Sequence, residues 1–434
     1  MRPRDQRFPL TALLAALTVT FLVACDLDEA GPTPTLTPAT ATPADADTDP
    51  DPAETLDLVA ERIEALIDLE RGADLEISLL DDEALAELIA ELLADPESIE
   101  SIRRDQDFYA LFGLIRPHTD LLELNEEMLN AGVAGLYRPE LDHHYIRLFG
   151  SFSSLEEATA SHEYAHYLQD VHFDLDRMFD DDAGDRDAEL ALQALIEGDA
   201  TYIQFQYVAE HFNAVQTFGM SFGGLMAASE APSVAYVFGR ETSFVYLGGQ
   251  RWIDDMLWFG FERGDLYANP PRTTREILDQ TTYTDGLRFD RVELALDFGA
   301  LPGDWTVGPR ETIGQLLLSI WLEEVGVRPS RADDAASGWT GDALHVLHQD
   351  GEAVAFVAQV DWEAPAEAIE FTEAASGALD DDRRYERQVC SGCAPGTWQG
   401  PAGILTIHAL DTGSTLLVVA PSTDEVQQLI DAVR

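Results

Sequence analysis

The string His-Glu-Tyr-Ala-His that begins at His162 restricts the local fold more strongly than any other part of the sequence. In a helix with about 3.6 residues per turn, positions four apart lie on the same face, so His162 and His166 can bind one metal ion together. Glu163 then lies beside the ion, where a carboxylate can take a proton from a metal-bound water. Residues 155–168 contain no Pro or Gly, and two serines before them are N-cap candidates. We therefore expect a helix that carries two ligands of a zinc site.

A catalytic zinc ion needs a third protein ligand and an open position for water. We expect this ligand to be Glu197, which lies in a second helical segment, at residues 187–207, and follows His166 by 31 residues. Glu197 interrupts an apolar run, and a buried carboxylate is costly unless it is paired or binds a metal ion. The alternative is that Glu197 lies on the solvent side of an amphipathic helix.

This order of residues, H-E-x-x-H followed by a Glu on a second helix, resembles that of the gluzincin metallopeptidases. More narrowly, residues 56–207 resemble a group of uncharacterised bacterial proteins, secreted or lipid-anchored, that have a minimal gluzincin core. The shared strings are a G-x-Y-x-P turn within residues 133–139, an edge strand at 144–149, the zinc helix with its exit at 162–175, and an E-G-D-A-T segment at 197–201. The resemblance implies a mainly helical catalytic lobe with a small edge-strand element.

The same resemblance assigns roles to individual residues. It implies that His162, His166 and Glu197 bind one Zn²⁺ ion and that Glu163 is the general base of a peptidase. In such a mechanism the base accepts a proton from the attacking water and hands it to the leaving amine. Many gluzincins also stabilise the oxyanion with a His or Tyr. The candidates for that role here are Tyr202, Tyr207, His211 and Tyr283.

Three residues are candidates for orienting the metal ligands through hydrogen bonds. Asp170 follows His166 by four positions on the same helical face and can accept a bond from its second ring nitrogen. Thr201 has the same spacing from Glu197, at a position where the larger thermolysin-like gluzincins carry an Asp, and Asp199 is an alternative to it. Each of the three can equally be a surface polar residue near a helix end.

The amino terminus resembles that of a bacterial lipoprotein. Three arginines precede an apolar stretch at residues 8–24, and Cys25 ends a Leu-Val-Ala-Cys string that resembles a lipobox. We expect residues 1–25 to be a signal peptide and Cys25 to be lipidated, which anchors the protein outside the cytoplasm. Asp26 resembles the signal that retains lipoproteins in the inner membrane of Gram-negative bacteria. The alternative is an uncleaved anchor, or a secretory signal that happens to contain a cysteine.

The net charge of this chain is strongly negative. It has 81 Asp and Glu against 26 basic residues, all of them Arg, and this excludes the basic face that nucleic-acid binding requires. The excess of carboxylate side chains is compatible with a salty or acidic environment, or with electrostatic attraction of basic peptide substrates. Five aspartates between residues 180 and 187 are either a calcium site or, as we favour, a solvated loop.

The only cysteines besides Cys25 are Cys390 and Cys393. A single pair excludes a zinc ribbon, and in an oxidising compartment a local disulfide between them is favoured over a redox centre. The cysteine usage therefore agrees with export from the cytoplasm.

The rest of the chain indicates an α+β protein of two lobes. Residues 26–53, rich in Pro, Thr, Ala and Asp, form a disordered tether, because this composition cannot bury a core. Residues 54–335 form the helical zinc-metallopeptidase-like domain, with its motif core at 133–211, and 336–434 form a C-terminal ferredoxin-like α+β domain. In that domain we expect strands at 343–348, 353–362, 403–409 and 415–420, and helices at 365–375 and 423–433.

The sequence thus predicts a lipid-anchored zinc peptidase that acts on peptides or proteins and binds the membrane through Cys25. The alternative, from another class, is a noncatalytic lipoprotein that keeps zinc for structure and serves as a binding or scaffold module at the cell envelope. A structural zinc ion is normally closed by four protein ligands, whereas a catalytic one keeps an open position. The number of ligands around the metal therefore separates the two. The sequence carries no indication of the oligomeric state.

Overall fold

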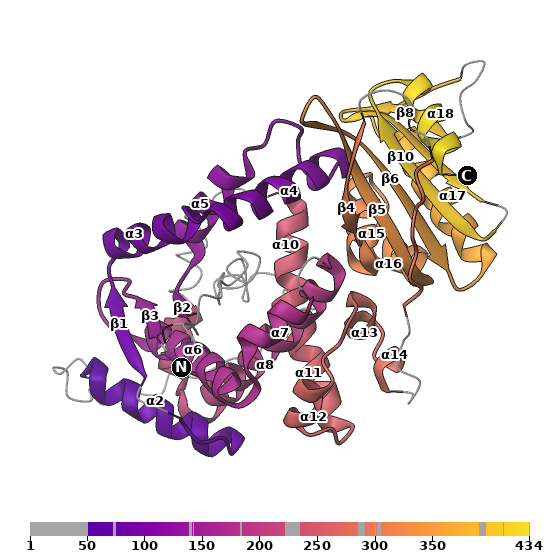
Figure 1. Ribbon diagram of the computed structural model, residues 1–434. Helices are drawn as coiled ribbons and strands as arrows, with labels where there is room; N and C mark the ends of the chain where they lie inside the picture. Colours follow the sequence, from indigo (N-terminus) through magenta and orange to yellow (C-terminus); the bar gives the residue numbers. More distant parts are fainter. Residues whose placement is uncertain are drawn as a thin grey trace, which may run out of the picture. The chain divides into compact units, whose positions relative to one another are not determined.

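The protein is a mixed α+β structure, described here from a computed structural model (Figure 1). The described residues are 51–72, 75–138, 141, 143–182, 185–221, 235–284, 291–299, 301, 305–389, 396–410 and 412–433. They divide into two compact units, which we describe separately. Unit 1 takes its described residues from 1–94, 125–176 and 200–233, and unit 2 takes them from 95–124, 177–199 and 234–434. Within the described residues, every helix is too short or too polar to cross a membrane.

Unit 1 combines helices with a small sheet. Its sheet has the strand order β1-β3-β2, in which β1 runs parallel to β3 and β2 runs antiparallel to it. The strand predicted at 144–149 is present as β3, but it is the central strand, so its prediction as an edge strand is wrong. The strands are packed next to α6 (Figure 1). The elements are α2 (Pro52–Ile67), β1 (Glu76–Leu80), α3 (Asp82–Leu93), most of α5 (Leu121–Gly132), β2 (Gly135–Arg138), β3 (His143–Arg147) and α6 (Ser154–Phe173).

Helix α6 begins and ends where its sequence dictates. Ser153 is the N-cap, and its side chain and that of Glu156 form a capping box, which satisfies backbone N–H groups of the first turn. At the other end Asp174 adopts a left-handed conformation, with φ of 60°, and stops the helix. Between them the helix is almost wholly buried, and it packs with residues of α2, β2, β3 and α8 in one core. The prediction of a helix around residues 162–166 is confirmed.

Unit 2 contains a group of helices and a large sheet. Helix α8 (Arg186–His211) is continuous, with its residues up to Asp199 in unit 2 and the rest in unit 1. The α11 helix crosses α8 at close range, because a Cβ atom on Gly198 would lie 2.3 Å from the carbonyl carbon of Gly249. The helices are α4 (Pro96–Phe112), α7 (Leu175–Asp182), α10 (Tyr236–Ser243), the π-helical turn η3 (Phe244–Gly248), α11 (Gly249–Trp258), α12 (Arg263–Ala268), α13 (Thr274–Leu278) and α14 (Thr281–Thr284).

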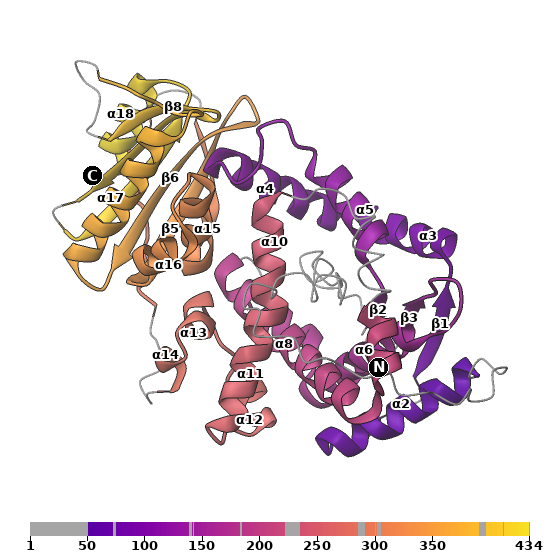
Figure 2. The same cartoon turned by 180° about the vertical axis from the view of Figure 1, so that it is seen from behind.

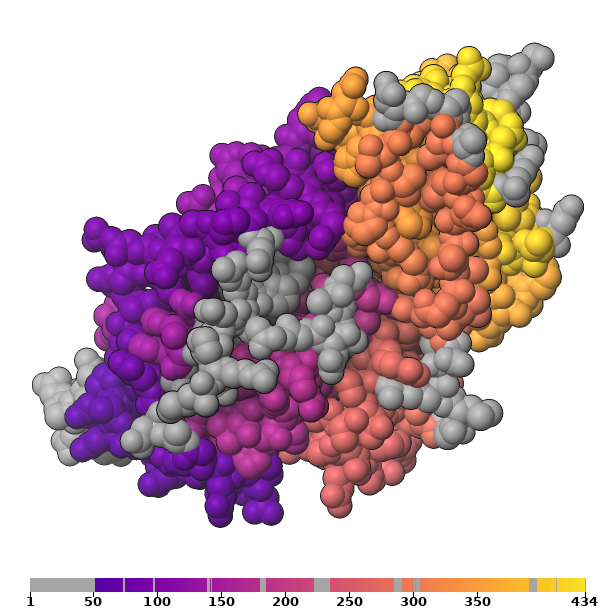
Figure 3. Space-filling model, in the orientation of Figure 1, coloured from indigo at the N-terminus to yellow at the C-terminus, as the bar shows by residue number. Residues whose placement is uncertain are grey.

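The sheet of unit 2 is antiparallel throughout and has the order β4-β5-β6-β10-β9-β8-β7. Its lobe forms the orange-to-yellow surface in the space-filling view (Figure 3). The elements are β4 (Thr306–Glu311), α15 (Gly314–Glu324), α16 (Pro329–Ala336), β5 (Trp339–Gln349), β6 (Glu352–Trp362), α17 (Pro365–Asp381), β7 (Glu386–Arg387), β8 (Thr397–Gly400), β9 (Gly403–Ala409), β10 (Ser414–Ala420) and α18 (Thr423–Ala432).

The four strands and two helices expected in this lobe are confirmed, but their arrangement differs from a ferredoxin-like lobe in two respects. The sheet has seven strands, and it already starts with β4, ahead of residue 336. Helices also cover both faces, whereas a ferredoxin-like sheet has them on one. Helix α18 packs on the face that carries Val357 and Val418, while Phe371 of α17 packs against Trp362 on the other face, beside α15 and α16 (Figure 2).

Candidate metal centre

Helices α6 and α8 bring His162, His166 and Glu197 together. One ligand atom from each side chain lies within 4.8 Å of the other two, and the three residues are 1%, 9% and 6% exposed. The two Nε2 atoms of the histidines face each other at 3.1 Å, with their rings nearly perpendicular. The structure thus places the three sequence-predicted ligands at one point. Two imidazole nitrogens and one carboxylate oxygen are a donor set that zinc prefers.

The tautomer of His166 suits metal binding. Its Nδ1 lies 2.8 Å from Oε1 of Gln169, three residues further along α6. Because an amide oxygen can only accept a hydrogen bond, Nδ1 carries the proton and Nε2 presents its lone pair to the neighbouring ligands. This is the orientation that a metal-binding imidazole needs, and it supports the fit of a divalent ion to these residues.

Glu197 is positioned by the helix that carries it. Later residues of α8, Ala200 and Ile203, pack in the same core as α6, and Gln204 donates a hydrogen bond from its side chain to the carbonyl oxygen of Ala158, 2.8 Å away. Positions 197, 200, 201 and 204 share one face of a helix. The face of α8 that packs on α6 therefore also presents Glu197, which explains why an acidic residue interrupts an apolar run.

Glu163 lies next to His162 on α6 and is buried, with 2% exposure. Its side chain lies against strand β2, because a Cβ atom added to Gly135 would stand 2.6 Å from Oε1 of Glu163. The carboxylate expected to serve as general base is therefore a packed group whose defined neighbour is the backbone of Gly135.

At Nδ1 of His166 the structure places Gln169, so the role of Asp170 in orienting a ligand imidazole stays a prediction. Asp170 accepts a bond from the hydroxyl of Tyr137 at 3.1 Å and one from the backbone N–H of Leu175, also at 3.1 Å. These contacts fix the exit of α6 against β2. Gln169 was not among the predicted site residues, although its spacing of three from His166 was a usable signal.

Thr201 does not bond to Glu197. It is buried, and its hydroxyl has no hydrogen-bond partner within the described part of the chain. Asp199 is fully buried, pairs with Arg263 at 2.8 Å and accepts a bond from the hydroxyl of Tyr267 at 3.0 Å. Burial raises the pKa of Tyr267 well above its usual value, and the carboxylates of Asp199 and Glu197 raise it further. Asp199 therefore anchors α8 to α12 close to Glu197.

Of the four candidates for an oxyanion-stabilising residue, two have hydroxyl groups with other partners. The hydroxyl of Tyr207 donates to Glu157 at 2.7 Å and accepts from Arg62, and that of Tyr283 donates to the carbonyl oxygen of Asn269. His211 lies against the ring of Tyr207, and Tyr202 packs on the core of unit 1. None of these contacts favours one candidate.

The acidic segment at residues 180–187 covers the end of α7 and the start of α8, so it is only partly a loop. Asp187 is fully buried and accepts two hydrogen bonds from Thr274, while Asp185 pairs with Arg291 at 2.5 Å. The described residues place no group of three acidic ligands there that could hold a calcium ion. Cys25, the predicted disulfide between Cys390 and Cys393, and the predicted tether up to residue 50 lie outside the described residues. The tether was predicted to end at residue 53, but Asp51 caps helix α2 and residues 52 and 53 belong to it.

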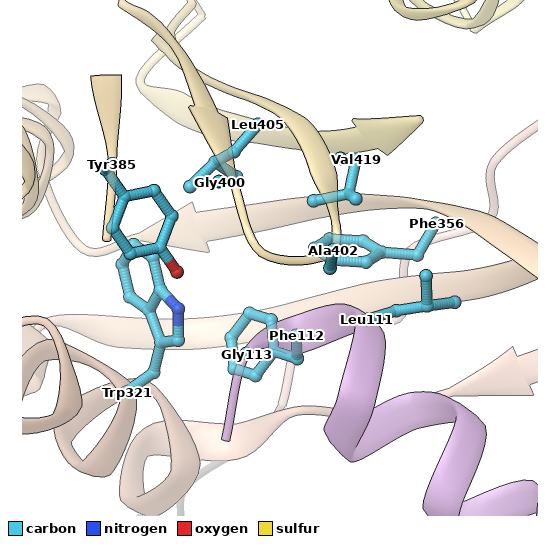
Figure 4. A pocket seen from close by; sticks show the side chains of 11 residues that line it. Leu111, Phe112, Gly113, Trp321, Phe356, Tyr385, Gly400, Ala402, Leu405 and Val419 are labelled. Atoms are coloured by element: carbon cyan, nitrogen blue, oxygen red, sulfur yellow. The ribbon is translucent and has the colours of Figure 1, made fainter. Parts of the chain in front are cut away.

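A separate pocket lies in unit 2, between the end of α4 and the sheet (Figure 4). It encloses about 300 Å³, part of it open to solvent, and its lining is almost entirely apolar, with Phe112, Trp321, Phe356 and Tyr385 among the lining residues. The ring of Phe112 stacks on that of Trp321, with centroids 5.5 Å apart. The pocket holds none of the predicted site residues and no acid–base group other than the Tyr385 hydroxyl.

Comparisons with known proteins bear on the C-terminal lobe. Residues 306–430 match a family described as Domain of unknown function (DUF8575). The match starts at β4 and ends within α18, so it agrees with the extent of the seven-stranded sheet rather than with a boundary at residue 336. No curated protein and no solved structure matches the chain. The metal centre lies outside the matched residues.

Proposed function

We propose that this protein is a zinc-dependent peptidase, with His162, His166 and Glu197 as the metal ligands and Glu163 as the general base. The observation that carries the proposal is the convergence of three buried ligand atoms, two nitrogens and one oxygen, within 4.8 Å of one another. The resemblance of the sequence to minimal gluzincins supports it, and so does the combination of a buried zinc helix with a small sheet packed on it.

In this proposal the residues of the site have separate chemical roles. A zinc ion held by these residues would supply a Lewis acid for a peptide carbonyl and for water. Glu163 has the role of accepting a proton from the attacking water and delivering it to the leaving amine. Gln169 holds the tautomer of His166, and Asp199, through Arg263 and Tyr267, holds the helix that carries Glu197. The net reaction is the hydrolysis of one peptide bond by one water.

Two features favour catalysis over a structural metal. Among the residues that the structure describes, the ligand group has three members, and no fourth His, Cys, Asp or Glu joins it. A structural zinc ion normally has four protein ligands. In addition, β2 lies at the edge of its three-stranded sheet, next to Glu163, and an extended peptide can pair with such an edge.

We propose further that the protein works outside the cytoplasm, anchored to the bacterial membrane through a lipid on Cys25. The support is the sequence alone, namely the basic and apolar leader, the lipobox-like string, and the Pro-rich composition of the segment that follows it. The substrate is a peptide or protein, since the strongly negative charge disfavours nucleic acid.

The second candidate is a noncatalytic envelope lipoprotein in which zinc only stabilises the fold. The deep burial of His162, Glu163 and Glu197 favours it, because a catalytic centre must admit a substrate. The two candidates differ in one measurable property, the turnover of a peptide.

The experiment measures bound zinc and the cleavage of a mixed peptide library by the full-length protein, beside Glu163→Gln and His166→Ala. We expect the wild type to hold one zinc ion and to cleave. Glu163→Gln should keep the ion and lose cleavage, and His166→Ala should lose both. Equal cleavage by Glu163→Gln and wild type would refute the assignment of the base. A wild type that holds zinc and cleaves nothing would favour the structural candidate.

A further inference from the structure

Strand β2 leaves room for the side chain of Glu163 at Gly135. A Cβ atom at this position would lie 2.6 Å from Oε1 and 2.7 Å from Cγ of Glu163, and 2.7 Å from Cγ2 of Thr159. Gly135 does not have a left-handed backbone, so conformational freedom does not explain a glycine here. The explanation is space, because the Glu163 side chain lies directly on the backbone of the strand.

The neighbouring strand contacts the same residue from its backbone side. His144 of β3 is 1% exposed, and its imidazole lies within reach of the backbone carbonyl oxygen of Glu163. Nδ1 is the nitrogen that can donate to this oxygen, since Nε2 has no hydrogen-bond partner among the described residues. Burial, followed by the nearby rings of His166 and His143, lowers the pKa of His144 to about 3. The ring is therefore a neutral donor at pH 7.

Aromatic rings hold His144 in this position. The rings of Tyr137, Tyr164 and Tyr167 meet it edge-on, with centroids 4.9, 6.4 and 6.2 Å away. Tyr137 is also its cross-strand partner, so β2 and β3 present Gly135 and His144 to α6 as one hairpin. The hairpin therefore contacts both the side chain and the backbone of Glu163.

We propose that Gly135 and His144 are positioning residues that fix the carboxylate of Glu163 beside the metal ligands. The inference rests on the proposed function, in which Glu163 accepts a proton. Because Gly135 has no Cβ, the side chain of Glu163 can lie directly on the backbone of β2. His144 contacts the backbone of Glu163 from β3. A general base displaced by about 1 Å loses about a hundredfold in rate, so this contact has a measurable effect.

The test compares Gly135→Ala with Gly377→Ala in the full-length protein. The control makes the same chemical change in α17, where nothing lies within 4 Å of the added methyl group. Both variants and Glu163→Gln are loaded with Co²⁺, and the visible absorption of the ion is titrated between about pH 5 and pH 9. This titration follows the ionisation beside the metal and does not require turnover.

We expect Gly135→Ala to move the midpoint of the Co²⁺ titration by about half a pH unit or more, toward the midpoint of Glu163→Gln. The same variant should lower kcat about tenfold or more, while KM and metal content stay within about twofold of the wild type. Gly377→Ala should match the wild type. His144→Phe, which keeps a ring without the donor, should lower kcat similarly, and His144→Asn, which restores an N–H near Nδ1, should recover most of it.

The outcomes separate this inference from the proposed function. A Gly135→Ala protein with wild-type midpoint and kcat would overturn the positioning role, as would equal losses in His144→Phe and His144→Asn. If the wild type binds Co²⁺ but cleaves no peptide, the proposed function fails. The midpoint shift of Gly135→Ala then still decides whether the hairpin sets the state of Glu163.

Discussion

Replacement of Asp187 by Asn should make the protein more stable at alkaline pH and leave it unchanged in acid. Asp187 lies in the first turn of α8 and is fully buried. One carboxylate oxygen accepts bonds from the N–H and the hydroxyl of Thr274, at 3.2 and 2.5 Å, and the other has no hydrogen-bond partner within the described residues. Burial raises the pKa of Asp187 to about 7, the bonds from Thr274 oppose the rise, and the carboxylates of Asp185 and Asp342 add to it.

The magnitude and the sign follow from this shift. From its ordinary value of 3.8, the pKa of Asp187 rises by about three units, and at about 1.4 kcal/mol per unit the folded state loses about 4 kcal/mol when the carboxyl ionises. Below pH 3.8 the group is neutral in both states and contributes nothing. Between pH 3.8 and 7 the unfolded chain releases the proton and the fold keeps it, so the free energy of unfolding falls as pH rises. Above pH 7 the full loss is present.

An asparagine reproduces the neutral form at every pH. We therefore expect Asp187→Asn to match the wild type near pH 4 and to exceed its free energy of unfolding by up to about 4 kcal/mol near pH 8. Urea unfolding followed by tryptophan fluorescence suits this measurement, because all seven tryptophans of the chain lie between residues 252 and 398, within unit 2. Asp254→Asn, on the exposed side of α11, is the matched control. A difference between Asp187→Asn and wild type that stays constant from pH 4 to pH 8 would refute this account of the buried carboxyl.

Three further changes have defined outcomes. Gln169→Leu removes the acceptor that orients a ligand imidazole and should weaken zinc binding about 10- to 100-fold in a chelator competition, without loss of helix content by circular dichroism. Gly198→Ala places a methyl group 2.3 Å from the carbonyl carbon of Gly249 and should lower the midpoint of urea unfolding by the equivalent of about 1–3 kcal/mol. Gly264→Ala, where the added methyl group meets open space, should leave this midpoint unchanged. Cys25→Ser should abolish the incorporation of labelled fatty acid and release the protein from the membrane fraction, and retained labelling would exclude Cys25 as the acceptor.

The sequence was informative where the signal is local. His162 and His166 are one helical turn apart, and a capped segment without Pro or Gly had to place them on one face, as α6 does. Glu197 could be chosen because a carboxylate in an apolar run needs a buried partner, and α8 presents it to α6. In the C-terminal lobe, strands were predicted at 353–362 and 415–420, and the structure has β6 and β10 there.

Strands β4 and β7 and the hydrogen-bond partner of His166 were not predicted, because they depend on contacts that the local sequence does not determine. Strand β4 carries a Gly-Pro pair and an irregular register between Val307 and Arg310, and β7 has two exposed residues, so neither shows the alternation expected of a strand. Gln169 and Asp170 both lie within about 60° of His166 around the helix axis, so periodicity alone does not choose between them. The residues that separate them lie outside this stretch of the helix, because the hydroxyl of Tyr137 and the backbone N–H of Leu175 both donate hydrogen bonds to Asp170.

The composition of α6 also shows why the site could be found at all. An ordinary surface helix has one apolar face, yet α6 buries both its apolar and its polar sides, including Thr159, Ser161, His162, Glu163, His166 and Gln169. Such burial is unfavourable unless each polar group has a partner, because removing an unpaired polar side chain from water costs about 1–3 kcal/mol. Some partners are visible, in the carbonyl oxygen of Ala158 for Ser161 and in Gln169 for His166. The two Nε2 atoms face each other at 3.1 Å with a Glu197 carboxylate oxygen near both, and the proposed zinc ion would be a partner that all three share.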